Sequence, residues 1–210
     1  MKENKAARAI TIGIVGGVGS GKSFTTAEFV AQGAAKFDAD SEAKKLYEDP
    51  EVVELVRQNW KDVLDDAGKL DRAKLAAIVF APDEEGAVNL AKLNSILHPL
   101  LFRRFREWLG NLQDHEFAIL DAPLLFEVGW ETNVDYVVFV NADEETRRRR
   151  TILRGWNPDE ITRREARQIP LDVKRARADF IVDASHDDSA MDRQVFLIME
   201  RIRFLKRARS

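Results

Sequence analysis

Eight residues of this chain have the types and the spacing needed to hold the phosphate groups of a nucleotide. They run from Gly16 to Ser23, read GGVGSGKS, and fit the pattern G-x-x-x-x-G-K-[ST]. Glycines allow the tight turn that aims backbone N–H groups at phosphate oxygens, and the positive end of a following helix faces the same oxygens. In this pattern Lys22 reaches the β- and γ-phosphates and the Ser23 hydroxyl binds Mg²⁺. The pattern predicts an ATP site with Mg²⁺.

The segments on both sides of this loop support the prediction. Residues 9–15 form a short apolar run rich in β-branched side chains, typical of a buried parallel strand, and residues 25–31 have helical apolar spacing. Strand, loop and helix are the context in which the pattern binds phosphate, whereas a glycine-rich turn without a ligand is the alternative. The residues predicted to contact ATP here are Gly17, Val18, Gly19, Ser20, Gly21, Lys22, Ser23 and Phe24.

Composition excludes several classes of protein. The 210 residues carry a net charge of −3 and contain no cysteine, so disulfides and cysteine-based catalysis or zinc sites are absent. The charge gives no general attraction to nucleic acid or anionic membranes, and no apolar run approaches the roughly 20 residues that cross a bilayer. Residues 1–8 are charged and lack the apolar core of a secretory signal. We expect a cytoplasmic protein with small-molecule partners, no nucleic-acid or membrane partner, and a monomeric or weakly homo-oligomeric state.

Short apolar segments predict the α/β class, with a mostly parallel five-stranded sheet flanked by helices. The five predicted strands are residues 9–15, 34–37, 117–121, 134–140 and 180–183. A long C-terminal helix over about 190–206 places one apolar stripe against the sheet.

Aspartates follow two of these strands. Ligands of open α/β sheets bind at the carboxyl ends of the strands, so Asp40 is a candidate for catalysis. Asp38 is a candidate helix cap or a group that supports the site. Asp121 ends an apolar strand, the pattern of a carboxylate that holds Mg²⁺ or its water, although a strand can also simply end at an exposed acid.

The stretch from residue 51 to about 112 gives no strand signal and reads as helical. We expect Pro82 and Gly86 to interrupt the helices and Pro99 to kink or restart one. Such a stretch is too long for a simple crossover between strands, which predicts an inserted substrate-binding subdomain. Arg72 and His98 are its notable polar residues, each either an ordinary surface or turn residue or a contact to the substrate.

Arginines gather in the stretch after the fourth strand. A helix over about 143–154, capped by Asn141 or Asp143, places Arg150 and Arg154 on one side, where two guanidinium groups could clamp transferring phosphates. Residues 155–158 break this helix, and a second basic helix follows over about 159–168. Helix, break and helix resemble a lid that closes over ATP and excludes water. The basic residues of this predicted lid are Arg154, Arg163, Arg164 and Arg167.

Several motifs, taken in order, resemble the dephospho-coenzyme A kinase family from Ile12 to about Asp183. The phosphate loop is followed by FDAD at 37–40, similar to the family's IDAD element, and by LDR at 70–72. LNSILHP at 93–99 and PLLFE at 123–127 resemble two further family motifs. The spacing of Arg164, Gln168, Lys174, Ala178 and Asp179 also follows the family pattern, whereas Ala184 stands where the family usually has asparagine.

This resemblance implies ATP-dependent phosphorylation of the ribose 3′-hydroxyl of dephospho-coenzyme A. It implies that Asp40 is the general base, that Arg150 is a lid arginine at ATP, and that Arg72 and His98 bind the acceptor. It also implies one phosphate-loop kinase domain over 9–208, with a core of about 9–40, 113–145 and 178–208, an acceptor-binding insert of about 41–112 and a lid of about 146–177. Another small-molecule kinase, a GTP switch and an inactive nucleotide-binding protein are the alternatives.

Overall fold

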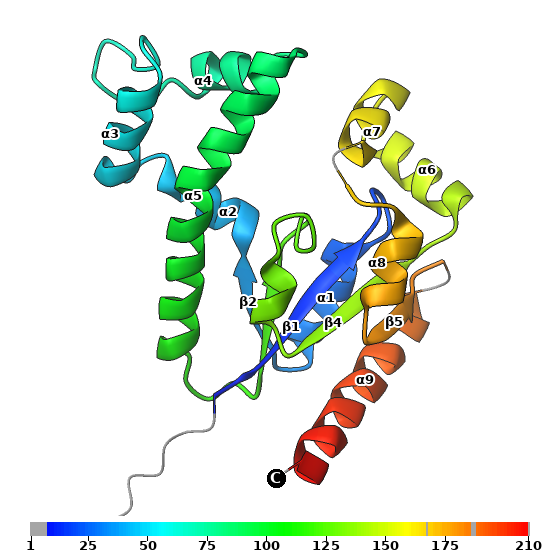
Figure 1. Ribbon diagram of the computed structural model, residues 1–210. Helices are drawn as coiled ribbons and strands as arrows, with labels where there is room; N and C mark the ends of the chain where they lie inside the picture. The colour runs from blue at the N-terminus through cyan, green and yellow to red at the C-terminus, as the bar shows by residue number, and fades with distance from the viewer. Residues whose placement is uncertain (1–7, 167, 186–187, 210) are drawn as a thin grey trace, which may run out of the picture. The chain divides into compact units, whose positions relative to one another are not determined.

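The computed structural model describes residues 8–166, 168–185 and 188–209, and their helices and strands alternate along the chain (Figure 1). The strands are β1 (Ile10–Gly16), β2 (Ala35–Asp38), β3 (Phe117–Asp121), β4 (Tyr136–Asn141) and β5 (Phe180–Asp183). The helices are α1 (Lys22–Ala31), α2 (Ala39–Leu46), α3 (Pro50–Asn59), α4 (Arg72–Val79), α5 (Glu84–Asn111), η1 (Trp130–Asn133), α6 (Glu144–Leu153), α7 (Pro158–Glu165), α8 (Leu171–Arg177) and α9 (Asp188–Arg209).

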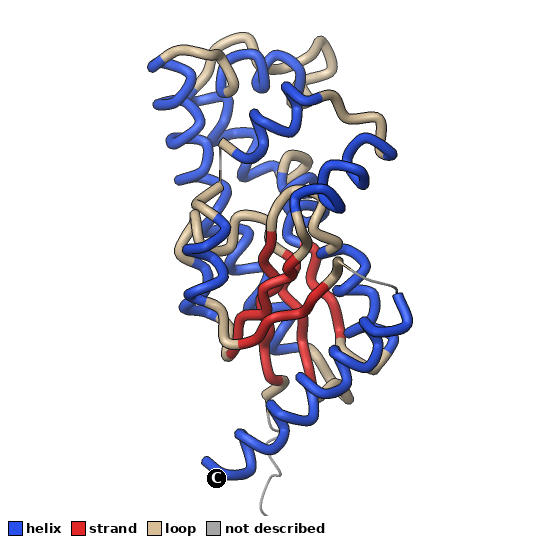
Figure 2. Tube along the Cα trace, turned by 90° about the vertical axis from the view of Figure 1, so that its right-hand side faces the viewer, coloured by secondary structure: helices blue, strands red, loops and turns tan. Residues whose placement is uncertain are grey.

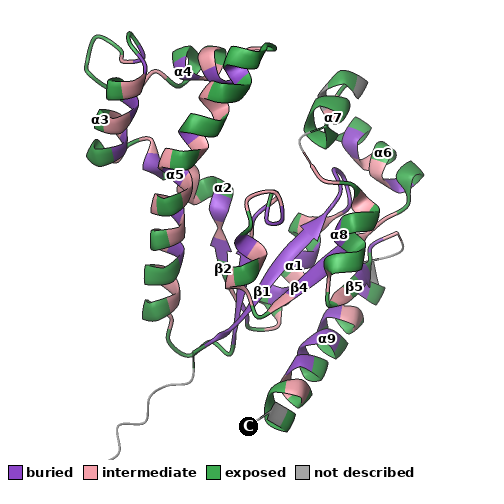
Figure 3. Cartoon of the chain, in the orientation of Figure 1, coloured by how far each residue is buried: buried purple, intermediate pink, exposed green. Residues whose placement is uncertain are grey.

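The strands form one five-stranded sheet in the order β2-β3-β1-β4-β5, which confirms the predicted fold class (Figure 2). β1 is parallel to both β3 and β4, and β4 is parallel to β5. Every residue of β1 is buried, so the strand is purple along its length in Figure 3. Parallel strands covered on both faces require such uninterrupted apolar runs. The central position of β1 sets the phosphate loop at the middle of the sheet's carboxyl edge.

Helices pack against this sheet through apolar side chains. α1 contacts β1 and β3, and α9 contacts α1 and β5. The apolar stripe of α9 is buried in the core and consists of Met191, Val195, Ile198, Met199 and Ile202. α8, which the sequence did not predict, contacts β1 and β4. A helix of seven residues is too short to show a clear helical period, so no local pattern predicts it.

Residues Asp38–Asn111 form a second compact unit, and the remainder of the chain forms the first. Within the second unit, α2, α3 and α4 each contact α5. Aspartates cap three of these helices: Asp38 accepts from the Ser41 N–H, Asp49 from Glu51, and Asp71 from Ala73 and Lys74. Side-chain oxygens at these positions satisfy backbone N–H groups that the first helical turn leaves without partners.

Two of the expected helix interruptions need correction, since Gly86 does not break a helix and Pro99 does not start a new one. α5 runs without a break through Pro99, because the buried side chains of Leu93, Leu97, Leu101 and Phe105 keep a continuous apolar stripe on both sides of the proline. Gly86 lies in the first turn of the same helix, and its N–H donates to Asp83 Oδ1 at 2.7 Å. Tertiary packing and a capping bond therefore override the local signals.

Candidate active site

The phosphate-binding pattern forms the turn between β1 and α1. Gly19 and Gly21 adopt φ angles of 74° and 101°, in the left-handed region that favours glycine. A Cβ at Gly19 would also lie 2.6 Å from the Arg147 carbonyl oxygen. The Ser20 hydroxyl is buried in the loop without a hydrogen-bond partner among the described residues. A loop that leaves a buried hydroxyl unpaired is suited to a ligand that supplies the partner, as phosphate oxygens do.

The Lys22 side chain hydrogen-bonds back to the start of the phosphate loop. Its Nζ donates to the carbonyl oxygens of Gly16 and Gly17 at 2.9 and 3.0 Å. The pKa of Lys22 is lowered to about 8, mainly by burial and then by the positive charges of Lys174 and Arg154, while the carboxylates of Asp121 and Glu127 partly oppose this shift. Two carbonyl dipoles hold the ammonium only weakly compared with an anion, so phosphate oxygens can take their place.

Asp121 lies at the carboxyl end of β3, beside this loop. Its Oδ2 forms an ion pair with Lys36 Nζ at 3.1 Å, and its side chain is largely buried. No group of three or more acidic or histidine side chains among the described residues is arranged to hold a metal ion. A metal at this edge would therefore depend on oxygens that the nucleotide supplies.

The arginine-rich helix α6 presents two of its side chains to the phosphate loop. Arg150 donates from Nη1 to the Ser20 carbonyl oxygen at 3.2 Å and from Nη2 to the Ala184 carbonyl oxygen at 2.7 Å. Arg147 donates to the Val18 carbonyl oxygen at 3.4 Å and pairs with Glu165 of α7 at 2.7 Å. Arg154 is exposed just after the end of α6. Arg147 was not singled out from the sequence, although its spacing of three from Arg150 puts both on one helix face.

α6 and α7 are joined by a break at residues 154–157. Their side chains, together with Val18 of the phosphate loop, line an open pocket with a volume of about 280 Å³. Asp143 caps α6 by accepting from the Thr146 N–H at 2.7 Å, so Asp143 is the cap and Asn141 is not. Arg164 stacks on Trp156 at 4.3 Å from its ring centre, and Arg163 donates to the Asp159 carbonyl oxygen. Arg167 lies outside the described residues.

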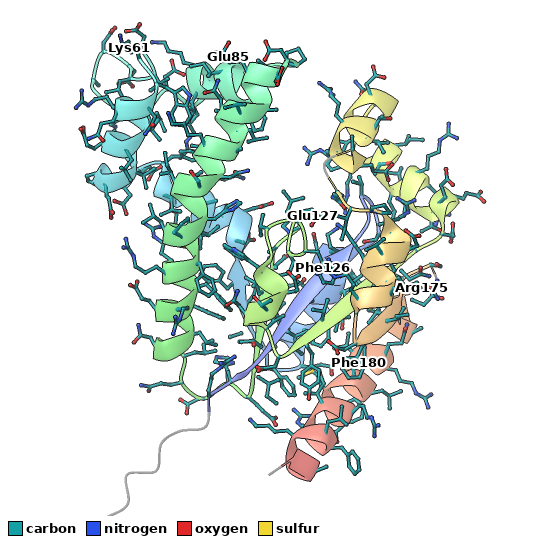
Figure 4. The ribbon with its side chains drawn as sticks, viewed as in Figure 1. Lys61, Glu85, Phe126, Glu127, Arg175 and Phe180 are labelled. Carbon is teal, nitrogen blue, oxygen red and sulfur yellow. The ribbon has the colours of Figure 1, made fainter. Side chains whose placement is uncertain are left out.

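A buried ion pair that sequence reasoning did not assign lies beside the phosphate loop. Lys174 of α8 is fully buried, and its Nζ lies 2.8 Å from Glu127 Oε1. Glu127 lies in the turn that follows β3 (Figure 4). The same Nζ donates to Gln168 Oε1 at 2.9 Å, and the Ile169 N–H donates to Glu127 Oε1 at 2.9 Å. The available signal was the single carboxylate within the apolar segment PLLFE.

The remaining candidates belong to the second unit. Asp40 lies exposed in the first turn of α2, two residues after the end of β2. Arg72, the first residue of α4, donates to the Lys44 carbonyl oxygen at 2.8 Å and lies 5.4 Å from the ring centre of Tyr47. His98 is half-buried in α5, and this burial lowers the pKa of its imidazole.

Comparison with known proteins first defines the class. The sheet order, the loop between β1 and α1 and the helix pair α6–α7 are those of a phosphate-loop kinase fold. Shikimate kinase from Acinetobacter baumannii superposes with a TM-score of 0.53, covering 94% of this chain and 95% of that one. At 14% identity this likeness concerns the fold alone.

The family follows from closer matches. Residues 10–189 match the dephospho-CoA kinase family. A dephospho-CoA kinase of Corynebacterium glutamicum is 39% identical over 181 residues, which are 83% of this chain and 88% of that protein. A crystal structure of a Thermus thermophilus protein has a TM-score of 0.79 at 31% identity, covering 92% of this chain and 98% of that one. This chain belongs to the dephospho-CoA kinase family.

Proposed function

We propose that this protein transfers the γ-phosphoryl group of ATP to the ribose 3′-hydroxyl of dephospho-coenzyme A, giving coenzyme A and ADP in the final step of coenzyme A synthesis. Membership of the family over residues 10–189 supports the substrate pair. The observation that carries the chemistry is the phosphate loop itself, with its left-handed glycines, its unpaired Ser20 hydroxyl and Lys22 at its centre.

The loop binds the triphosphate through its backbone N–H groups from Gly17 to Phe24, and Lys22 turns from its two carbonyl partners to the β- and γ-phosphates. Contact with phosphate favours the charged form of Lys22, which offsets the burial that lowers its pKa to about 8. Phosphoryl transfer depends mainly on positioning and on neutralising charge, and this loop does both.

Mg²⁺ is part of the proposal. The Ser23 hydroxyl is exposed on the first turn of α1, and the Asp121 carboxylate ends β3. Oxygen donors of this kind suit Mg²⁺, which usually combines one or two protein ligands with substrate phosphates and water. Ser23 and Asp121 are the residues that would hold the ion or its water, and the bound ion neutralises charge on the phosphates.

Asp40 accepts the proton of the 3′-hydroxyl as that oxygen attacks the γ-phosphorus, the role of a general base. Asp40 is exposed in the first turn of α2, where the helix dipole favours a negative charge. The chain supplies separate groups for separate tasks: Lys22 for the phosphates and Asp40 for the proton.

Arg150 stabilises the transferring phosphoryl group, with Arg154 in support, when the lid of about residues 146–177 closes. Arg150 already hydrogen-bonds to the backbone of the phosphate loop at Ser20, which supports a role at ATP. Closure of the lid excludes water, which otherwise competes with the acceptor for the phosphoryl group.

The acceptor binds to the helical insert of about residues 41–112, with Arg72 and His98 as its contacts. The core of about 9–40, 113–145 and 178–208 completes a single kinase domain over 9–208. We further propose a cytoplasmic location and a monomeric or weakly homo-oligomeric protein. No helix within the described residues is both long and apolar enough to cross a bilayer.

The test is incubation of the purified protein with ATP, Mg²⁺ and dephospho-coenzyme A, with ADP and coenzyme A measured together. Adenosine and AMP serve as parallel acceptors, and Asp40→Asn is the control variant. Equal amounts of ADP and coenzyme A, largely lost in the variant, are expected. Turnover with another acceptor alone would overturn the substrate, and absence of turnover with ATP still bound would overturn the kinase activity.

A further inference from the structure

The Glu127–Lys174 ion pair joins three segments of the chain. Glu127 belongs to the turn after β3, Lys174 to α8, and both hydrogen-bond to the segment that precedes α8, through Ile169 N–H and Gln168 Oε1. Figure 4 places Glu127 on its turn, at the same edge of the sheet as the end of β1. Residues 168–170 connect the helix pair α6–α7 to α8. The helix pair joins the rest of the chain at two points, after β4 and before α8. The ion pair holds the second of these attachments in place.

This attachment also contacts the phosphate loop. The Leu171 methyl groups lie 3.1 Å from where a Cβ on Gly17 would be, and an Arg147 nitrogen lies equally near on the α6 side. Lys174 and Glu127 are also close enough to Lys22 for their charges to act on it. Both attachments of the helix pair thus reach the residues that hold phosphate.

A purely structural role does not explain charged residues at this position. Burying two charges carries a desolvation cost, and apolar side chains of similar volume often replace a buried pair without loss of stability. Moreover, Glu127 Oε2 is buried with no hydrogen-bond partner among the described residues. The Glu127 carboxylate therefore makes its contacts with Lys174 and Ile169 through Oε1, while Oε2 is buried without a hydrogen bond from the described residues.

We propose that Glu127 and Lys174 are positioning residues that hold the segment 168–170 and thereby set the helix pair α6–α7 for closure on the phosphate loop. The proposal rests on the phosphoryl transfer described above. ATP binds mainly through the loop from Gly17 to Phe24, so loss of the pair reduces turnover and leaves ATP affinity nearly unchanged.

The test variant is Glu127→Met/Lys174→Met, which removes both charges together and keeps similar volumes. We expect kcat to fall by about tenfold or more, with the dissociation constant of ATP within about threefold of the original. Hydrogen exchange of the Ile169 amide should become faster, since its acceptor is lost. Gln168→Leu, which leaves the buried pair intact, serves if the double variant does not fold, and should reduce kcat by about threefold with the same ATP affinity.

The matched control is Arg203→Met/Glu116→Met, which removes an ion pair of the same 2.8 Å length from α9 and the approach to β3. It should leave kcat unchanged. Unaltered kcat in a folded Glu127→Met/Lys174→Met variant, or unchanged exchange at Ile169, would overturn the proposal. Failure of the unmodified protein to form coenzyme A would instead overturn the proposed function, while the exchange measurement would still test whether the ion pair holds the segment 168–170.

Discussion

The phosphate loop and the helical unit Asp38–Asn111 hold their candidate residues in different ways. Lys22 and Arg150 are bound to backbone carbonyl oxygens of the loop region, at Gly16, Gly17, Ser20 and Ala184. Asp40 and Arg72 are exposed side chains on short helices. The first group lies against backbone carbonyl oxygens near the phosphate loop, whereas the second group is open to solvent. We therefore expect substitutions of Lys22 and Arg150 to lower turnover, and substitution of Arg72 in the helical unit to weaken acceptor binding.

The largest effect is expected for Lys22→Ala. Removing the ammonium deletes charge stabilisation of the β- and γ-phosphates, and kcat should fall by about a thousandfold. Coupled detection of ADP and coenzyme A measures this loss. Lys69→Ala, at an exposed lysine, is the control and should retain full activity. A Lys22→Ala enzyme within tenfold of the original would contradict the role of this residue.

Asp40→Asn should lower kcat by about a hundredfold or more, because the amide cannot accept the hydroxyl proton. Asp38 provides a matched control two residues away, since it caps α2 through the Ser41 N–H at 2.9 Å. Asp38→Ala should lower the free energy of unfolding by about 1 kcal/mol and Asp38→Asn by less. Urea unfolding separates this loss of stability from a loss of turnover. If Asp40→Asn were as active as Asp38→Asn, Asp40 would not be the base.

Arg150→Ala should lower kcat by about a hundredfold, because an electrophilic clamp of this kind is worth a few kcal/mol in the transition state. Arg154→Ala, on the exposed residue after α6, should have an effect of less than about tenfold. Single-turnover kinetics with saturating ATP measures the chemical step in both variants. Equal losses of kcat in the Arg150→Ala and Arg154→Ala variants would show that the hydrogen bond from Arg150 to the loop backbone does not mark a larger catalytic role.

Arg72→Ala tests the helical unit. Loss of a cation that contacts the acceptor should raise the KM for dephospho-coenzyme A by about tenfold while kcat and the KM for ATP stay nearly constant. Steady-state kinetics with each substrate varied in turn gives this separation. A change in the KM for ATP alone would contradict the assignment of Arg72 to acceptor binding.

Features encoded by a local pattern could be predicted from the sequence, whereas contacts between distant segments could not. GGVGSGKS constrains the backbone, so the motif alone located Lys22 and its loop, and short apolar segments located all five strands. The contacts of Arg147 and the pairing of Lys174 with Glu127 join segments far apart in the chain, and no local pattern encodes them. α5 continues as one helix through Pro99 for a related reason, since packing along the helix outweighs a missing hydrogen bond.

The smallest expected effect concerns His98. Burial disfavours its charged form and lowers its pKa below 6.5, so the folded protein binds this proton more weakly than the unfolded chain. The stability that results is fully present above the unfolded pKa of about 6.5 and is lost as pH falls through the lower folded pKa. NMR titration of the imidazole Cε1–H signals measures the shift, and the signal absent from His98→Gln identifies the residue.

His115 is the internal reference, since it is exposed and its Nδ1 lies 3.1 Å from the Gly33 carbonyl oxygen. If dephospho-coenzyme A binds beside His98, its phosphate charge favours the imidazolium, and the His98 midpoint should rise on addition of the acceptor. If the titration midpoint of His98 does not change when the acceptor is added, His98 does not contact the acceptor. Arg72 would then be the one remaining proposed contact in the helical unit.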